Sequence, residues 1–120
     1  MSKILNMLMA FVMSFGISGS NVNPSDIPEN SNFEVHFIDV GQADSALIEC
    51  DGETMMIDGG NVADSNVVAA YLKKEDVTEL NYVVCSHAHE DHVGGLSGAL
   101  SVTKADNIYA PKTEANTKAY

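Results

Sequence analysis

The stretch Ser86-His87-Ala88-His89-Glu90-Asp91-His92, continued by Val93-Gly94-Gly95, decides the interpretation of this chain. It places three of the chain's 4 histidines close together, directly after an apolar run of strand length. Imidazole and carboxylate are the ligands of a catalytic zinc that keeps one position open for water, whereas closed structural sites favour cysteine thiolates. We therefore predict a metal site whose ligands are His87, His89, Asp91 and His92.

The spacing of these residues suits two metal ions. On a short loop, His87 and His89 can point to one side and hold one ion, while Asp91 and His92 turn toward a second. Two zinc ions lower the pKa of a shared water and stabilise the charge that develops on a carbonyl or phosphoryl oxygen. Asp91 is placed to orient that hydroxide and is a candidate catalytic residue. Glu90 is interpreted as a surface charge. The alternative to a metal site is a histidine-rich loop that is merely solvated, or histidines satisfied within a core.

Three further residues are candidates for the same site. Asp58 ends a predicted strand, and its carboxylate could accept hydrogen bonds from the ligand loop or fix a ligand histidine, so it is the second candidate catalytic residue. A plain turn aspartate is the alternative. For Asp39 and Asp44, a turn role and a functional role both stay open. His36 alternates with core positions on a strand, and we expect packing or surface exposure rather than metal binding.

The hydropathy pattern predicts an α/β chain. Period-two alternation and short apolar runs predict strands, and the Asp51-Gly52 pair is typical of a tight hairpin turn. Apolar residues three and four apart predict a helix that starts at Asp64 or Ser65 and continues through Leu72. The strands are expected at 33–39, 45–50, 54–58, 80–86 and 107–110, with a short helix at 96–100.

The N-terminal residues read as a targeting segment. Residues 1–20 open with Lys3, continue through the apolar stretch 4–17 and end in small residues, which is typical of an export signal peptide. The apolar stretch is shorter than the about 20 residues that span a bilayer, so membrane attachment through it is the second choice. Residues 21–32 form a linker, and 33–120 the domain. We expect secretion or display at a bacterial cell surface.

Composition narrows the class of partner. The chain has 17 acidic residues against 6 basic ones, a formal net charge of −11 and no arginine. Strong nucleic-acid binding by these residues is not expected, because it relies on a basic surface that releases counterions. The cysteines, Cys50 and Cys85, are expected to be buried free thiols, with a disulfide between them as the alternative.

Together these motifs resemble the metallo-β-lactamase superfamily, in which an aspartate ends an early strand and H-x-H-x-D-H follows the next buried one. Three segments more narrowly resemble the hydrolase domain of ComEC-type competence proteins: VHFIDVGQADS at 35–45, IDGG at 57–60 and SHAHEDHVGG at 86–95. The resemblance covers about residues 33–111.

The resemblance implies an αββα sandwich with zinc bound in its cleft. His87 and His89 would hold the first zinc, Asp91 and His92 the second, and Asp58 would lie behind them. The ComEC-like branch is associated with DNA uptake and suspected of degrading a DNA strand, and secreted relatives include phosphodiesterases acting on cell-wall phosphorylcholine.

One departure from the family pattern is large. The family takes a further histidine, a bridging aspartate and another histidine from its C-terminal half. After His92 the chain has no histidine and only one aspartate, Asp106. We therefore expect only the N-terminal half of the fold, with an apolar sheet face left for the missing C-terminal half to cover.

The functional expectation follows from the motif and the resemblance. We expect an exported, zinc-dependent, ComEC-like hydrolase that cleaves a phosphodiester, with DNA among the candidates, or a related ester through a metal-bound hydroxide. The substrate is a small molecule or a polymer. A carboxylic or thioester hydrolase of the same fold is one alternative, and an inactive fragment or interaction module is the other. The 120 residues alone are expected to be incomplete and inactive.

Overall fold

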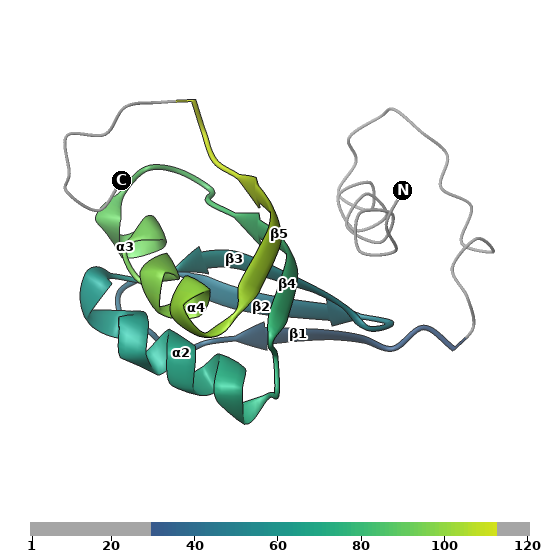
Figure 1. The fold of residues 1–120 in the computed structure, drawn as a ribbon. Helices are drawn as coiled ribbons and strands as arrows, with labels where there is room; N and C mark the ends of the chain where they lie inside the picture. Colours follow the sequence, from purple (N-terminus) through teal and green to yellow (C-terminus); the bar gives the residue numbers. More distant parts are fainter. Residues whose placement is uncertain (1–29, 113–120) are drawn as a thin grey trace.

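The computed structural model describes residues 30–112 and consists of one sheet with helices packed on it (Figure 1). The expected signal peptide and most of the linker lie outside the described residues. The sheet has five strands in chain order: β1 (Phe33–Phe37), β2 (Ser45–Cys50), β3 (Glu53–Gly59), β4 (Glu79–Val84) and β5 (Lys104–Tyr109).

The sheet is mixed, with antiparallel and parallel strand pairs. β1, β2 and β3 form an antiparallel meander, and β4 and β5 then join parallel to β3. The turn between β2 and β3 has positive φ at both central residues, 49° at Asp51 and 86° at Gly52. This backbone matches the right-handed twist of paired strands, so the predicted tight turn is confirmed.

Helices fill the connections around the parallel strands. They are η2 (Val62–Asp64), α2 (Ser65–Lys74), α3 (Glu90–Val93) and α4 (Leu96–Val102). Asn61 and Asp64 form a capping box at the start of η2, which satisfies amide groups that have no partner within the helix. In Figure 1, α2 and α4 lie side by side against the sheet.

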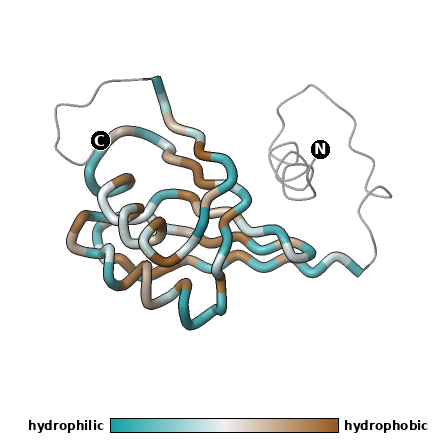
Figure 2. Tube along the Cα trace, viewed as in Figure 1, coloured by the Kyte–Doolittle hydropathy of each residue, from teal (hydrophilic) through white to brown (hydrophobic). Residues whose placement is uncertain are grey.

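The buried side chains form two clusters, one on each sheet face. The larger one lies between the sheet and the helices and includes Leu47, Met56, Val68, Leu72 and Leu80, each 0% exposed. The smaller cluster consists of Ile48, Cys50 and Met55. Along α2, Figure 2 shows hydrophobic residues interspersed with hydrophilic ones, as expected for a helix with one buried face.

The α/β fold class is confirmed, and element ends are where expectation and structure differ. β1 and β4 end two residues before the predicted 39 and 86, and β5 begins at Lys104, before the predicted 107. The one-turn helix α3 was not predicted, because its four residues are too few to show a helical period.

The expected orientation of β1 is wrong. His36 was assigned to alternate with core positions, yet Val35 is 41% exposed and Phe37 is 85% exposed. The register explains the difference, since Val35 pairs with Ile48 of the smaller cluster while His36 pairs with Leu47 of the larger one. His36 therefore lies on the face that carries α2, and its ring meets Tyr71 edge-on.

Two glycines let the helices approach other backbone very closely. A Cβ at Gly98 of α4 would overlap the carbonyl oxygen of Ser65 at the start of α2, and one at Gly95 would overlap the carbonyl oxygen of Gly59 in β3. Both neighbours are backbone atoms, which move only with their whole element. Within residues 30–112, no helix is long and apolar enough to cross a bilayer.

The contact at Gly98 makes a stability prediction. Gly98→Ala should lower the free energy of unfolding by about 2 to 3 kcal/mol, because the added methyl forces α4 away from α2. Gly41→Ala is the control: its φ is +67° and nothing lies within 4 Å of a Cβ there, so only left-handed strain of about 1 kcal/mol applies. Urea midpoints of the two variants test this, and equal midpoints would contradict it.

Candidate metal centre

The candidate residues meet where two neighbouring parallel strands end. Asp58 is the penultimate residue of β3, and the chain leaves the end of β4 and leads into α3. We refer to residues 86–92, which carry the predicted metal ligands, as the ligand loop. Because the carboxyl ends of parallel strands lie at the same sheet edge, this topology brings residues about thirty positions apart into contact.

The structure brings the three motif histidines together. The ring centroids of His87 and His89 are 4.7 Å apart, and those of His87 and His92 are 3.8 Å apart. Ser86 Oγ lies 3.0 Å from His87 Nδ1. Three imidazoles with Asp91 beside them match the nitrogen and oxygen donors that zinc takes in hydrolases, so the residues fit the predicted metal in kind.

Asp58 holds this arrangement from below. Its side chain is buried, its backbone has a left-handed φ of 56°, and its Oδ1 accepts the Ser86 N–H at 2.8 Å. Its Oδ2 accepts the Ser86 hydroxyl and lies 2.9 Å from His92 Nδ1. When the carboxylate accepts a hydrogen bond from Nδ1–H, Nε2 is left as the ligand atom of the imidazole. Asp58 is therefore a positioning residue of this site.

A second aspartate reaches the site from the loop between β1 and β2. Asp44 Oδ2 lies 3.6 Å from His92 Nε2, and Asp91 Oδ2 lies 3.8 Å from the same nitrogen. The Asp44 N–H also donates to the Asp91 carbonyl oxygen at 3.3 Å. For Asp39 and Asp44, the sequence left open whether each has a turn role or a functional role. Asp44 faces the site, whereas Asp39 is exposed and its carboxylate accepts the Gly41 N–H within the turn.

The motif residues are adjacent without forming a closed ligand set. Among the described residues, one group of three His, Cys, Asp or Glu side chains has all its ligand atoms within 4.8 Å of one another, and it consists of Glu34, His36 and Glu49. The assignment of His87, His89, Asp91 and His92 as metal ligands therefore stays a prediction, supported by their proximity and chemistry.

Two neighbours of the motif have structural contacts. Glu90 is exposed and its Oε1 accepts the Val62 N–H at 3.1 Å, which fits the interpretation of Glu90 as a surface residue. Ser86 was missed by the sequence interpretation, although it joins Asp58 to His87. Its only signal was a hydroxyl placed directly before the first histidine.

Within residues 30–112, neither Cys50 nor Cys85 forms a disulfide, as expected. Cys50 is buried in the smaller cluster, and Cys85 is half-buried one residue before the ligand loop. Burial raises the pKa of the Cys85 thiol, and the negative charge of Asp58 raises it further.

Comparison with known proteins identifies the class of protein that this fold and site define. The model of the metallo-beta-lactamase superfamily matches residues 38–119, and the chain belongs to that superfamily. A comparison with curated proteins finds no match.

Two solved structures are similar in fold. One is a metallo-beta-lactamase HARLDQ motif mutant of Cronobacter sakazakii, with a TM-score of 0.54, 20% identity, and coverage of 61% of this chain and 29% of that one. The other is metallo-beta-lactamase SMB-1 bound to 2-mercaptoethanesulfonate, with a TM-score of 0.54, 25% identity, and coverage of 67% and 33%. The chain thus spans about a third of the length of the structures it matches.

The role of Asp58 predicts a separation of zinc affinity from folding. Asp58→Asn keeps an acceptor for the Ser86 N–H and tolerates the left-handed backbone, so the protein should fold. It loses the charge that orients His92, and zinc affinity should fall about 10- to 100-fold. Zinc titration at neutral pH measures this, with Asp39→Asn as the charge-matched control. Equal affinities in the two variants would remove the positioning role.

The raised pKa of Cys85 predicts slow alkylation. Since the thiolate is the nucleophile, iodoacetamide at pH 8 should modify Cys85 more slowly in the folded protein than in urea. The folded-state rate should keep rising with pH above the ordinary thiol pKa. Peptide mapping by mass spectrometry distinguishes Cys85 from Cys50, and equal rates for Cys85 in both states would contradict the prediction.

Proposed function

We propose that this chain supplies zinc ligands to a hydrolase of the ComEC-like branch that cleaves a phosphodiester. The observation that carries the proposal is the ligand loop itself: three histidine rings lie together over a buried aspartate that accepts two hydrogen bonds from Ser86. A buried carboxylate committed to one loop and one imidazole is costly to place without a function.

The proposed ligand pairs follow the order of the motif. His87 and His89 would hold one ion, and Asp91 and His92 a second. Zinc held there would supply a Lewis acid and bring the pKa of a bound water near neutrality.

The chain's own residues prepare the site for that chemistry. Asp58 keeps the Nδ1 side of His92 occupied at 2.9 Å and so directs Nε2 outward. Asp91 and Asp44 lie on that outward side, at 3.8 and 3.6 Å from Nε2. Asp91 is half-buried, and in the proposed reaction its carboxylate accepts a hydrogen bond from the attacking water and fixes its direction.

The choice of branch rests on the segment that ends in Asp44. The DVGQAD stretch at 39–44 is the part of the sequence that resembles ComEC-type domains most narrowly. Its last residue reaches the candidate site, and its backbone is held there because Asp44 O accepts the Gly60 N–H at 2.9 Å. A segment that distinguishes the branch therefore contributes to the site, which supports a ComEC-like assignment.

Phosphodiester cleavage also suits the charge of the site. Asp44, Asp58 and Asp91 would repel a phosphate in the absence of metal, so binding of such a substrate would depend on the two cations. The chain's net charge of −11 adds no general attraction for nucleic acid. We propose export to the cell surface or medium, with retention by an N-terminal anchor as the alternative. A small phosphoester then fits the acidic chain better than long DNA.

A carboxylic or thioester hydrolase is the second candidate. The same donor set serves either reaction, since the loops around the metals select the substrate, and the two solved structures named above are metallo-beta-lactamases. Because the chain spans about a third of their length, activity is proposed for the whole protein. The 120 residues tested alone would serve as the inactive-fragment comparison.

Hydrolysis assays on the full-length protein test the proposal. With zinc present, bis(p-nitrophenyl) phosphate should be hydrolysed in preference to p-nitrophenyl acetate. His87→Ala and Asp91→Ala should each reduce kcat/KM at least about 100-fold, as expected when a metal ligand or water-positioning group is lost. Asp39→Asn should retain activity. Hydrolysis that survives both ligand substitutions would overturn the enzyme proposal, and preference for the acetate would favour the second candidate.

A further inference from the structure

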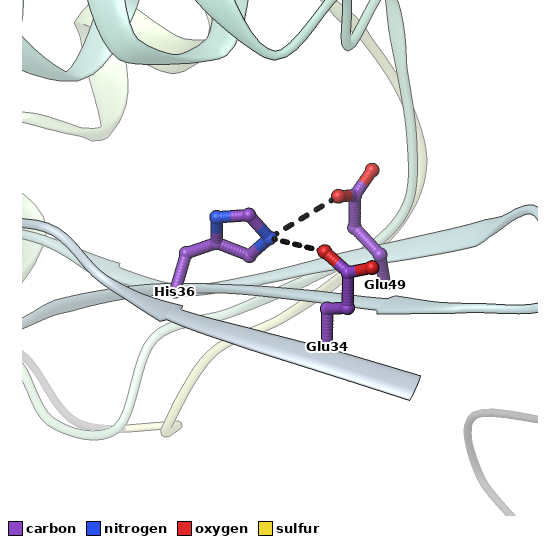
Figure 3. Close-up of side chains that lie close together, drawn as sticks. All are labelled: Glu34, His36 and Glu49. Carbon is purple, nitrogen blue, oxygen red and sulfur yellow. Dashed lines mark ion pairs between the residues drawn. The ribbon is translucent and has the colours of Figure 1, made fainter. Parts of the chain in front are cut away.

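A second group of metal-ligating side chains lies on β1 and β2, separate in the sheet from the loop that follows β4. Glu34, His36 and Glu49 point toward one another, as Figure 3 shows. His36 Nε2 is 3.6 Å from Glu34 Oε2 and 3.3 Å from Glu49 Oε2. All three ligand atoms lie within 4.8 Å of one another. We refer to these three residues as the strand triad.

Strand register places two negative charges directly opposite each other in the triad. Glu34 pairs with Glu49 across β1 and β2, and His36 follows two residues after Glu34 on the same face. Like charges directly opposite in an antiparallel pair destabilise the sheet. Within residues 30–112, no lysine pairs with either carboxylate, and Lys74 pairs with Glu75 instead, at 2.8 Å.

The imidazole of His36 is oriented from its other side. Its Nδ1 lies 2.8 Å from the hydroxyl oxygen of Tyr71 on α2. When Nδ1–H donates to Tyr71, the lone pair of Nε2 points between the two carboxylates. An oxygen acceptor on the far nitrogen is the usual support of a metal-ligating histidine.

The Nε2 atom itself lacks a suitable protein partner. Among the described residues it is a buried nitrogen with no hydrogen bond, since the carboxylates lie within ion-pair distance but outside hydrogen-bonding geometry. The whole side chain is 16% exposed. A buried polar atom without a partner is costly, and a cation between the three groups would satisfy it together with both carboxylates.

An acidic pocket lies next to the triad. Glu49 lines a pocket of about 280 Å³ together with Glu75, Asp76 and Glu79. Clustered carboxylates raise the local concentration of cations, so this pocket offers a cation a path to the triad.

We propose that Glu34, His36 and Glu49 form a divalent metal site of the zinc type. One imidazole and two carboxylates provide three ligands, and water would complete the coordination. Calcium and magnesium prefer sites made of oxygen alone, whereas an imidazole ligand favours zinc and its neighbours. Tyr71 is the positioning residue. An ion held here links edge strand β1 to β2, and the proposal is independent of the function proposed for the ligand loop.

Zinc titration of metal-free, full-length protein tests the triad. The His87→Ala/His89→Ala/Asp91→Ala/His92→Ala variant, which removes both proposed ligand pairs of the loop, should retain one zinc equivalent. Adding Glu34→Gln and Glu49→Gln should remove that equivalent or weaken it more than about tenfold. In the same background, Glu53→Gln/Asp106→Asn, which removes the same charge from β3 and β5, should leave zinc binding unchanged. Far-ultraviolet circular dichroism checks that each variant folds. If the variant with both Gln substitutions does not fold, Glu34→Gln alone, at an exposed position, replaces it in the titration.

Tyr71→Phe gives a readout that charge removal does not. It should leave the number of zinc ions unchanged and lower the affinity of the triad by about tenfold, because the imidazole loses its acceptor. The site is overturned if the variant that lacks all four loop ligands binds no zinc. It is also overturned if the Gln substitutions leave stoichiometry and affinity equal to the control. In either outcome the three side chains contact one another without a bound metal ion.

Discussion

The buried carboxylate of Asp58 is the constraint on which the site depends. It lies at the end of β3 and is almost fully buried. Its two oxygens form hydrogen bonds with the backbone and hydroxyl of Ser86 and with the ring of His92. A carboxylate removed from water needs such partners. The ligand loop, which leaves β4 and has no regular hydrogen-bond ladder of its own, therefore takes its position from an adjacent strand.

The fold was predictable where local pattern carries the information. The hairpin at Asp51-Gly52 and the helix from Ser65 follow from turn chemistry and apolar spacing, and the structure has both. The orientation of β1 was not predictable, because alternation reveals a period and not which of two apolar faces receives the helices. His36 was assigned to packing or surface on that ground, although register and Tyr71 place it beside two carboxylates.

The candidate site was predictable from residue types in one motif, and its supports were not. Three histidines within the six residues 87–92 predict a metal-binding loop by composition alone. The approach of Asp44 depends on how the β1–β2 loop is held against Gly60 and Asp91, which is a tertiary contact. Superfamily membership agrees with the motif, and the identity of the substrate depends on loops that such a motif does not encode.

The exposed ring of Phe37 has a consequence for how the protein behaves at high concentration. Among the described strands β1 lies at an edge of the sheet, and an edge that displays a large apolar side chain is a template for strand addition by a second copy. Charge on such an edge opposes that addition, and exposed Glu34 on the same strand supplies it. Neutralising Glu34 with a cation would weaken this protection, so colloidal stability and metal load are coupled at one strand.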